Sequence, residues 1–201
     1  MKHFWDERYA GPDYKYGTLP NEFLRTQVAG RLSPGNRVLV PGDGEGRNGV
    51  WLAGQGMAVT TLDYSAQGVD KALKLAAQHG VALEALCADL AEWRAAPASF
   101  DAVALIYLHL PSALRRRAHR QLAEALVPGG WLILEAFEPA QRQFSSGGPR
   151  DVDMLMRVED LREDFAGQLD LELLESVQIE LSEGGGHVGP ARVVRLIGRR
   201  R

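Results

Sequence analysis

The sequence predicts an α/β fold in which a mostly parallel sheet lies between layers of helices. An aliphatic run at 38–40 breaks into a glycine-rich loop, and a helix-like stretch follows at once. Strand-like and helix-like segments then alternate as far as residue 137, which is typical of right-handed βαβ units. Nearer the C-terminus, two alternating segments flank a glycine-rich turn, so the last strand is expected to be antiparallel.

The composition fits one globular domain. The 201 residues are 45% hydrophobic and 24% charged, so we expect a single domain over 1–201 with a substantial core. The net charge of −3 provides no basic field for nucleic acid, and no apolar run is long enough to cross a membrane. A single cysteine, Cys87, and the lack of a leader pattern predict a cytoplasmic protein. No metal site is predicted.

Residues 1–20 form an arm that is rich in aromatic, glycine and proline residues. Its aromatic side chains either pack on the domain or form a flap that stacks on a ligand. Asn21 is a good N-cap for a helix that we expect to run to about residue 32, where Ser-Pro-Gly ends it.

The glycine loop is the centre of the predicted site. Its glycines permit positive φ and leave room for a ligand beside the backbone; they are Gly42, Gly44 and Gly46. The N–H groups that open the next helix, expected from about residue 47 to 56, point toward the same place. The dinucleotide fingerprint Gly-x-Gly-x-x-Gly needs its third glycine at position 47, where this sequence has Arg47. This difference opposes a nicotinamide cofactor. The acids Asp43 and Glu45 would repel a pyrophosphate and suit a cationic ligand.

Acids also follow the next two predicted strands. Strand 58–62 ends at Asp63, whose carboxylate can accept both hydroxyls of a ribose. Ser65 then caps a helix that ends at Gly80. Strand 81–86 leads to Asp89, which is either an Asx turn or a ligand-binding group.

The remaining elements complete the sheet. We expect a strand at 100–106 followed by Tyr107 and His109, a helix at 111–127, a strand at 131–137 and a helix at 158–167. The hairpin strands are expected at 171–182 and 191–197. The glycine-rich loop 138–156 is either a lid or a surface loop. His187 lies in the hairpin tip and is either a surface residue or, because ligands bind at this sheet edge, part of the site.

Several of these segments resemble the class I S-adenosylmethionine-dependent methyltransferases along nearly the whole chain. The likeness rests on Gly-x-Gly-x-Gly with Asp63, on the acid-led strand 100–106, and on Leu-x-Pro-Gly-Gly before strand 131–137. Trp-Asp-Glu-Arg-Tyr at 5–9 and Tyr-Gly-Thr-Leu-Pro-Asn at 16–21 resemble the opening of the tellurite-resistance and thiopurine enzymes. The resemblance implies a three-layer Rossmann-like methyltransferase fold with seven strands in the order 3-2-1-4-5-7-6. It also implies S-adenosylmethionine as cofactor and S-adenosylhomocysteine as product.

The resemblance also implies the site residues. The carboxylate at Asp89 would accept a hydrogen bond from the adenine amino group. The cofactor-binding set is Trp5, Tyr16, Gly42, Asp43, Gly44, Gly46, Asp63, Tyr64, Ser65, Ala88, Asp89, Leu90 and Tyr107. The tellurite-resistance enzymes carry a His-Arg pair in the hairpin loop; here Val188 follows His187, and Arg192 is a looser substitute. Arg150 and Arg192 are therefore the substrate-binding candidates.

Methyl transfer from a sulfonium needs little more than a nucleophile held in line with it. A neutral acceptor also needs a base, and His187 and His109 have suitable intrinsic pKa values. We predict a methyltransferase for a small-molecule acceptor, such as a thiol, selenium or tellurium compound. A non-catalytic sensor of S-adenosylmethionine or S-adenosylhomocysteine and a nicotinamide-dependent oxidoreductase are the alternatives. The sequence names neither the acceptor nor an oligomeric state.

Overall fold

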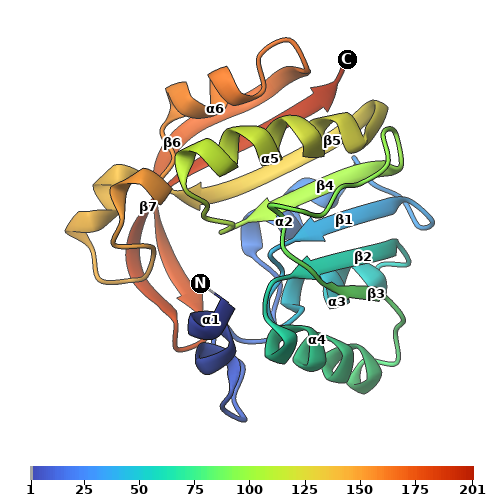
Figure 1. Ribbon diagram of the computed structural model, residues 1–201, viewed down its shortest axis with the longest axis vertical. Helices are drawn as coiled ribbons and strands as arrows, with labels where there is room; N and C mark the ends of the chain where they lie inside the picture. The colour runs from blue at the N-terminus through green and yellow to red at the C-terminus, as the bar shows by residue number, and fades with distance from the viewer. Residues whose placement is uncertain (1) are drawn as a thin grey trace.

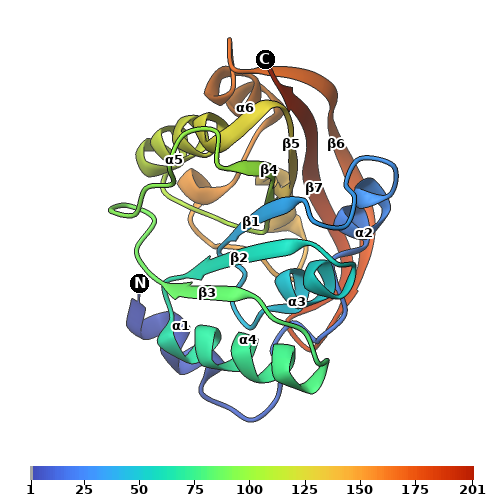
Figure 2. The same cartoon turned by 90° about the vertical axis from the view of Figure 1, so that its right-hand side faces the viewer.

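Within residues 2–201, which the computed structural model describes, seven strands form one sheet with helices on both faces (Figures 1 and 2). The strands are β1 (Arg37–Pro41), β2 (Ala58–Asp63), β3 (Glu84–Cys87), β4 (Phe100–Ile106), β5 (Leu126–Phe137), β6 (Leu169–Glu183) and β7 (His187–Arg200). The helices are α1 (Lys2–Tyr9), α2 (Glu22–Val28), α3 (Arg47–Gly54), α4 (Ala66–Gln78), α5 (Ser112–Ala125) and α6 (Val158–Asp164), with short 3₁₀ helices η1 (Pro139–Gln143) and η2 (Val152–Met154).

The strand order is β3-β2-β1-β4-β5-β7-β6, as expected. Strands β1 to β5 pair in parallel, whereas β7 is antiparallel to both β5 and β6. The predicted three-layer architecture and the reversed last strand are therefore confirmed. The carboxyl ends of β1, β2, β3 and β4 consequently meet at one edge, where open α/β sheets bind their ligands.

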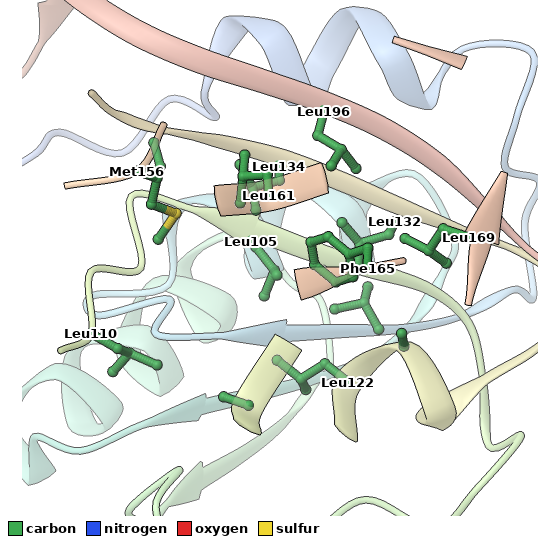
Figure 3. Packing of buried hydrophobic residues seen from close by; sticks show 14 of the residues in the cluster. Leu105, Leu110, Leu122, Leu132, Leu134, Met156, Leu161, Phe165, Leu169 and Leu196 are labelled. Carbon is green, nitrogen blue, oxygen red and sulfur yellow. The ribbon is translucent and has the colours of Figure 1, made fainter. Parts of the chain in front are cut away.

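Alternation along the central strands divides the core between the two faces. Leu39 and Val103 belong to a cluster on the face that α5 and α6 cover. Val38 and Ala102, their neighbours in sequence, belong to a second cluster with residues of α2 and α3. Figure 3 shows the first cluster from close by, with Phe165 lying beside Leu132 and Leu169. Both faces of the central strands are buried, which explains their nearly continuous apolar sequence.

Helix α2 is shorter than expected. It ends at Val28 and not near residue 32, because Ala29 leaves the helical region (ψ 123°) and Gly30 takes a φ of +80°. Helix α6 likewise stops at Asp164, three residues before the expected Gly167, which has a φ of +76°.

Strand boundaries shift for similar local reasons. Strand β3 begins at Glu84 and not at Val81, because the Val81 N–H donates to Ala76 O at 3.0 Å and finishes helix α4. Strand β5 begins before residue 131, since Leu126 already pairs with Phe100.

The hairpin is also longer and tighter than expected. Strands β6 and β7 extend until Glu183 pairs with His187, so the turn is only 184–186. His187 is thus the first residue of β7 and does not lie in a broad loop over 183–189. This places its side chain on a strand that the sheet holds in register.

The N-terminal arm contains a helix that the sequence did not predict. Helix α1 packs beside α4, and Figure 1 shows it near the β6–β7 turn. Tyr9 is buried at the end of α1, and its ring stacks on Trp5 with the centroids 5.4 Å apart. None of the helices in residues 2–201 has the length and apolarity needed to cross a bilayer.

Candidate active site

A cavity of about 810 Å³ lies at the carboxyl ends of the parallel strands. It extends from helix α1 and the glycine loop to the start of β7. Thirteen of the predicted site residues line it: Trp5, Tyr16, Gly42, Asp43, Asp63, Tyr64, Ala88, Asp89, Leu90, Tyr107, His109, Arg150 and His187. Four do not line it: Gly44, Gly46, Ser65 and Arg192.

The glycine loop is shaped by protein contacts as well as by the cavity. Its three glycines all have positive φ, between 58° and 89°. A Cβ on Gly44 would lie 2.6 Å from the Tyr9 hydroxyl, and one on Gly46 would lie 2.5 Å from the Ala72 Cβ. These two glycines therefore allow α1 and α4 to pack on the loop, which is a different role from the expected space for a ligand.

The two acids of the loop differ in their surroundings. Glu45 is already neutralised: Lys71 Nζ lies 2.7 Å from its Oε1, and the Lys15 N–H donates to its Oε2 at 2.7 Å. Asp43 accepts the Gly49 N–H at 3.0 Å through Oδ2, whereas its buried Oδ1 has no partner within residues 2–201. Burial raises the pKa of Asp43 to about 7, against the opposing effects of the Gly49 N–H and Arg47. Only Asp43 is available as an unpaired acid in this loop.

Asp63 joins the end of β2 to the glycine loop. Its Oδ2 accepts the Gly44 N–H at 2.8 Å and its Oδ1 accepts the Ser65 N–H at 2.9 Å. Each carboxylate oxygen keeps a second lone pair for a ligand hydroxyl. Ser65 does not reach the cavity, because its hydroxyl caps Gly68 of α4 and donates to Asp6 Oδ1 at 2.6 Å. Ser65 therefore connects α1 to α4.

Asp89 combines the two interpretations considered from the sequence. Its Oδ1 accepts the Ala91 N–H at 2.8 Å, which is an Asx turn, and its side chain also lines the cavity. The turn fixes the carboxylate at the end of β3, and within residues 2–201 no hydrogen bond uses its other oxygen, which can accept from a ligand.

Helix α1 contributes residues that the sequence reasoning missed. Arg8 and Tyr9 line the cavity next to Trp5. The Arg8 guanidinium lies 5.6–5.8 Å from the rings of Phe4, Trp5 and Tyr16, and its Nε donates to the Tyr16 hydroxyl at 2.9 Å. Positions 4, 5, 8 and 9 share one face of α1, so forming this helix brings their side chains to the cavity together.

Aromatic rings surround His187 at the other end of the cavity. Its ring centroid lies 4.4 Å from that of Tyr16, 4.7 Å from Tyr107 and 5.3 Å from Phe137. Tyr107 stacks on Phe137 and donates its hydroxyl proton to the buried carboxylate of Glu135 at 2.9 Å. Tyr107 also has a φ of +52°, an uncommon conformation for a bulky residue that often marks a functional site.

The two candidate bases are not equivalent. His109 donates from Nδ1 to Met154 O at 2.9 Å, and its Nε2 faces the Phe137 N–H at 3.4 Å. Burial lowers the pKa of His109 to about 4, so the ring is neutral and both nitrogens face backbone groups. His187 contacts Glu183 through Nδ1 at 3.1 Å, and no hydrogen-bond partner for its Nε2 occurs within residues 2–201. The geometry therefore favours His187 over His109 for proton transfer.

The two candidate substrate-binding arginines differ in their position relative to the cavity. Arg150 is exposed and lines the mouth of the cavity. Arg192 lies away from the cavity, because Glu138 accepts its Nε–H at 2.8 Å and the Ser176 hydroxyl accepts a second bond at 2.8 Å. The structure does not bring Arg192 to the site.

Known proteins similar in sequence to this chain include methyltransferases. The family model described as a methyltransferase domain matches residues 38–130. Thiopurine S-methyltransferases from two strains of Pseudomonas putida are 29% identical over 199 residues, covering 88% of this chain and 87% of theirs. The chain is thus similar to a methyltransferase domain over residues 38–130 and to thiopurine S-methyltransferases along most of its length.

Several solved structures share the fold. The N-methyltransferase NodS from Bradyrhizobium japonicum, in complex with S-adenosylhomocysteine, superposes with a TM-score of 0.70 at 18% identity and 99% and 97% coverage of the two chains. TehB from Haemophilus influenzae has a TM-score of 0.72 at 15% identity, covering all of this chain and 67% of its own. These likenesses show the fold.

The residues that line the cavity fit S-adenosylmethionine. The cavity volume lies within the range of about 300–1,000 Å³ that is usual for small-molecule sites. The unpartnered Oδ1 of Asp43 suits a cationic ligand, and the free lone pairs of Asp63 suit hydroxyl groups. The residues present therefore match a ligand that combines positive charge with a ribose.

Proposed function

We propose that the chain is an S-adenosylmethionine-dependent methyltransferase that acts on a small-molecule acceptor whose nucleophile is soft: a thiol, or a selenium or tellurium compound. The observation that carries the proposal is one cavity that joins an acidic end, at Asp63 and Asp89, to an aromatic end, at Tyr107, Phe137 and His187. The likeness to thiopurine S-methyltransferases over 88% of the chain supports a small sulfur acceptor.

At the acidic end, four side chains would hold the cofactor. Asp63 accepts the ribose hydroxyls, Asp89 accepts from the adenine amino group, and Asp43 attracts the cationic part. Arg8 lies over the same end and provides a cation for the carboxylate of the amino-acid part. When bound, S-adenosylmethionine supplies a methyl group that its sulfonium has already activated.

At the aromatic end, the surroundings favour a polarizable acceptor atom. Sulfur gains about 0.3–1.5 kcal/mol from contact with an aromatic ring, and selenium resembles sulfur in this respect. Leu108 and Met154 extend the apolar lining toward Arg150 at the cavity mouth. His187 accepts the proton of an un-ionised acceptor at Nε2, while the rings hold the acceptor in line and exclude water.

Calorimetry with S-adenosylmethionine tests the cofactor half of the proposal. Asp63→Ala removes two potential hydrogen bonds to a charged acceptor, so the affinity should fall by about 10–100-fold. Asp70→Ala, at an exposed position on α4, should bind as the wild type does. Because Asp63 also accepts two backbone N–H groups, a melting curve must first show that the variant is folded. Unchanged affinity would remove Asp63 from the ribose-binding role.

A panel of acceptors tests the other half. Turnover with thiols, selenite or tellurite, and none with amines or phenols, is the expected result. Turnover confined to amines or phenols would contradict the soft-nucleophile assignment. A cytoplasmic location, the exclusion of nucleic acid and a lid movement of 138–156 stay predictions.

A further inference from the structure

The carboxylate of Glu183 occupies an unusual place beside the site. It is the last residue of β6, and its side chain is only 12% exposed. Its Oε2 accepts two hydrogen bonds, one from His187 Nδ1 at 3.1 Å and one from the Arg47 guanidinium at 2.9 Å. Its Oε1 accepts from the Asn21 amide at 3.1 Å. Glu183 therefore lies between the cofactor loop, through Arg47, and the aromatic end of the cavity, through His187.

The contact with Glu183 determines which nitrogen of the His187 imidazole carries the proton. Burial alone would raise the pKa of Glu183, but the hydrogen bond from His187 and the charge of Arg47 outweigh it and lower the pKa to about 2. An ionised carboxylate can only accept, so His187 must carry its proton on Nδ1. Burial lowers the pKa of His187, and Glu183 opposes that effect in part. Near neutral pH the ring is thus neutral, with a lone pair on Nε2.

The edge of the ring that carries Nε2 faces a glycine. A Cβ on Gly147, in the loop 138–156, would lie 2.6 Å from His187 Cδ2 and 3.1 Å from Nε2. The imidazole ring also contacts Tyr16, tilted at 48°, and Tyr107, in an edge arrangement at 70°. Glycine at 147 therefore places no side chain of its own on this edge, and His187 lines the cavity.

We propose that Glu183 is a positioning residue: it holds His187 with the proton on Nδ1, so that Nε2 accepts the proton of the methyl acceptor. The inference rests on the proposed function. As the acceptor's lone pair forms its bond to the methyl carbon, the bond from that carbon to the sulfonium sulfur breaks and the sulfur keeps the electron pair. The acceptor's proton moves to Nε2, which leaves an imidazolium beside the Glu183 carboxylate.

The groups around His187 explain why the carboxylate is needed. Arg47 on α3 and Arg8 on α1 both disfavour a charged imidazole, and His109 lies on the same side of the cavity. Tyr16 and Tyr107 are un-ionised near neutral pH because burial raises the pKa of both. The negative charge of Glu183 is what stabilises the imidazolium that forms during transfer.

The first test needs no acceptor and no cofactor. Imidazole ¹⁵N chemical shifts distinguish the two neutral tautomers, and His187→Ala assigns the signal. Wild type should show the Nδ1–H form at neutral pH, and Glu183→Gln should show a mixture, because an amide can also donate to Nδ1. An Nε2–H form or an imidazolium in the wild type at neutral pH would overturn the proposal, even if the glutamine variant failed to fold.

The second test uses two thiols of different acidity. Glu183→Gln should lower kcat by about 10–100-fold with benzyl mercaptan, which is un-ionised near neutral pH. With a nitro-substituted thiophenol, which arrives as the thiolate, the change should stay within about threefold. Glu180→Gln, an exposed glutamate on the same strand, should match the wild type with both.

The outcomes separate this inference from the proposed function. Equal losses with the two thiols, or none with either, would overturn the positioning role while wild-type turnover upheld the methyltransferase assignment to thiols. A wild type that binds S-adenosylmethionine but methylates neither thiol would count against the proposed acceptor class, whereas the ¹⁵N measurement would still decide the tautomer. Glu183→Asp, which keeps the charge, should recover part of the lost rate.

Discussion

Replacing Asp43 with asparagine should change how the stability of the protein depends on pH. The carboxyl group is buried in the glycine loop, and one of its oxygens has no hydrogen-bond partner within residues 2–201. The other oxygen accepts the Gly49 N–H, a contact that an asparagine oxygen can keep. Asparagine therefore reproduces the protonated acid in shape and removes only the ionisable group.

The size of the effect follows from the pKa. Burial raises the pKa of Asp43 from 3.8 to about 7, and that difference corresponds to about 4 kcal/mol of folding free energy. The folded state holds this proton more tightly than the unfolded chain does. The stabilisation of the folded protein by protonated Asp43 is therefore fully present below pH 3.8, and it is lost as the pH rises from 3.8 to about 7.

Urea denaturation between about pH 4 and pH 8 measures this dependence. Relative to the wild type, Asp43→Asn should become more stable by about 4 kcal/mol across that range, and the difference should level off above about pH 7. Comparing the two proteins cancels the contributions of other carboxylates. Asp70→Asn, at an exposed site on α4, should run parallel to the wild type. A stability difference independent of pH would show that Asp43 ionises normally in the folded protein.

Binding of the cofactor should favour the ionised form of Asp43, whereas the free protein favours the protonated form. A cation near Asp43 favours the ionised carboxylate, so the wild-type affinity for S-adenosylmethionine should rise as the pH approaches about 7 from below and level off above it. The asparagine variant should lack that rise. The same substitution would then stabilise the free protein and weaken the complex, which is a known conflict between stability and function.

Two further substitutions test the close packing of the protein. Gly186→Ala places a Cβ 2.5 Å from the Tyr16 ring and should lower the free energy of unfolding by about 1–3 kcal/mol, measured with denaturant. Gly185→Ala, whose Cβ would have nothing within 4 Å, should leave the free energy of unfolding unchanged. Equal effects of the two substitutions would contradict the close approach of Gly186 to Tyr16. Asp164→Asn leaves the buried guanidinium of Arg115, now 2.8 Å from that carboxylate, without its counter-charge and should cost about 3–5 kcal/mol. Asp160→Asn, 3.8 Å from the same arginine and partly exposed, should cost under about 1 kcal/mol, and a similar loss in both would refute the assignment.

The parallel core of the fold could be predicted because its signals are local. Ser65 caps α4, and glycines such as Gly56 and Gly80, with φ of +85° and +66°, follow α3 and α4 as expected. Helix α1 was missed since its stability comes from packing Tyr9 against the glycine loop and Gly68 of α4. Few of its residues form a regular apolar face, so tertiary contacts decide its conformation.

The candidate site was predictable to the extent that it depends on strand ends. Asp63 and Asp89 follow directly from β2 and β3, whose carboxyl ends must meet at one edge. Glu183 could not be found in this way, because its partners Arg47 and Asn21 are more than a hundred residues distant in sequence. Arg192 was chosen for its proximity to His187 in the sequence, but the intervening strand places it beside Glu138.

Residues 15–17 of the N-terminal arm lie against the turn between β6 and β7, and glycines make this close contact possible. The Gly186 N–H donates to Lys15 O at 3.0 Å, and a Cβ on Gly184 would meet the backbone at Tyr16 and Gly17. This close approach brings the Tyr16 ring against His187 while Arg8 holds its hydroxyl. Tyr16 thus forms part of the wall beside α1 and part of the wall beside the candidate base. Any movement of the arm over the cofactor must therefore also change the shape of the acceptor pocket.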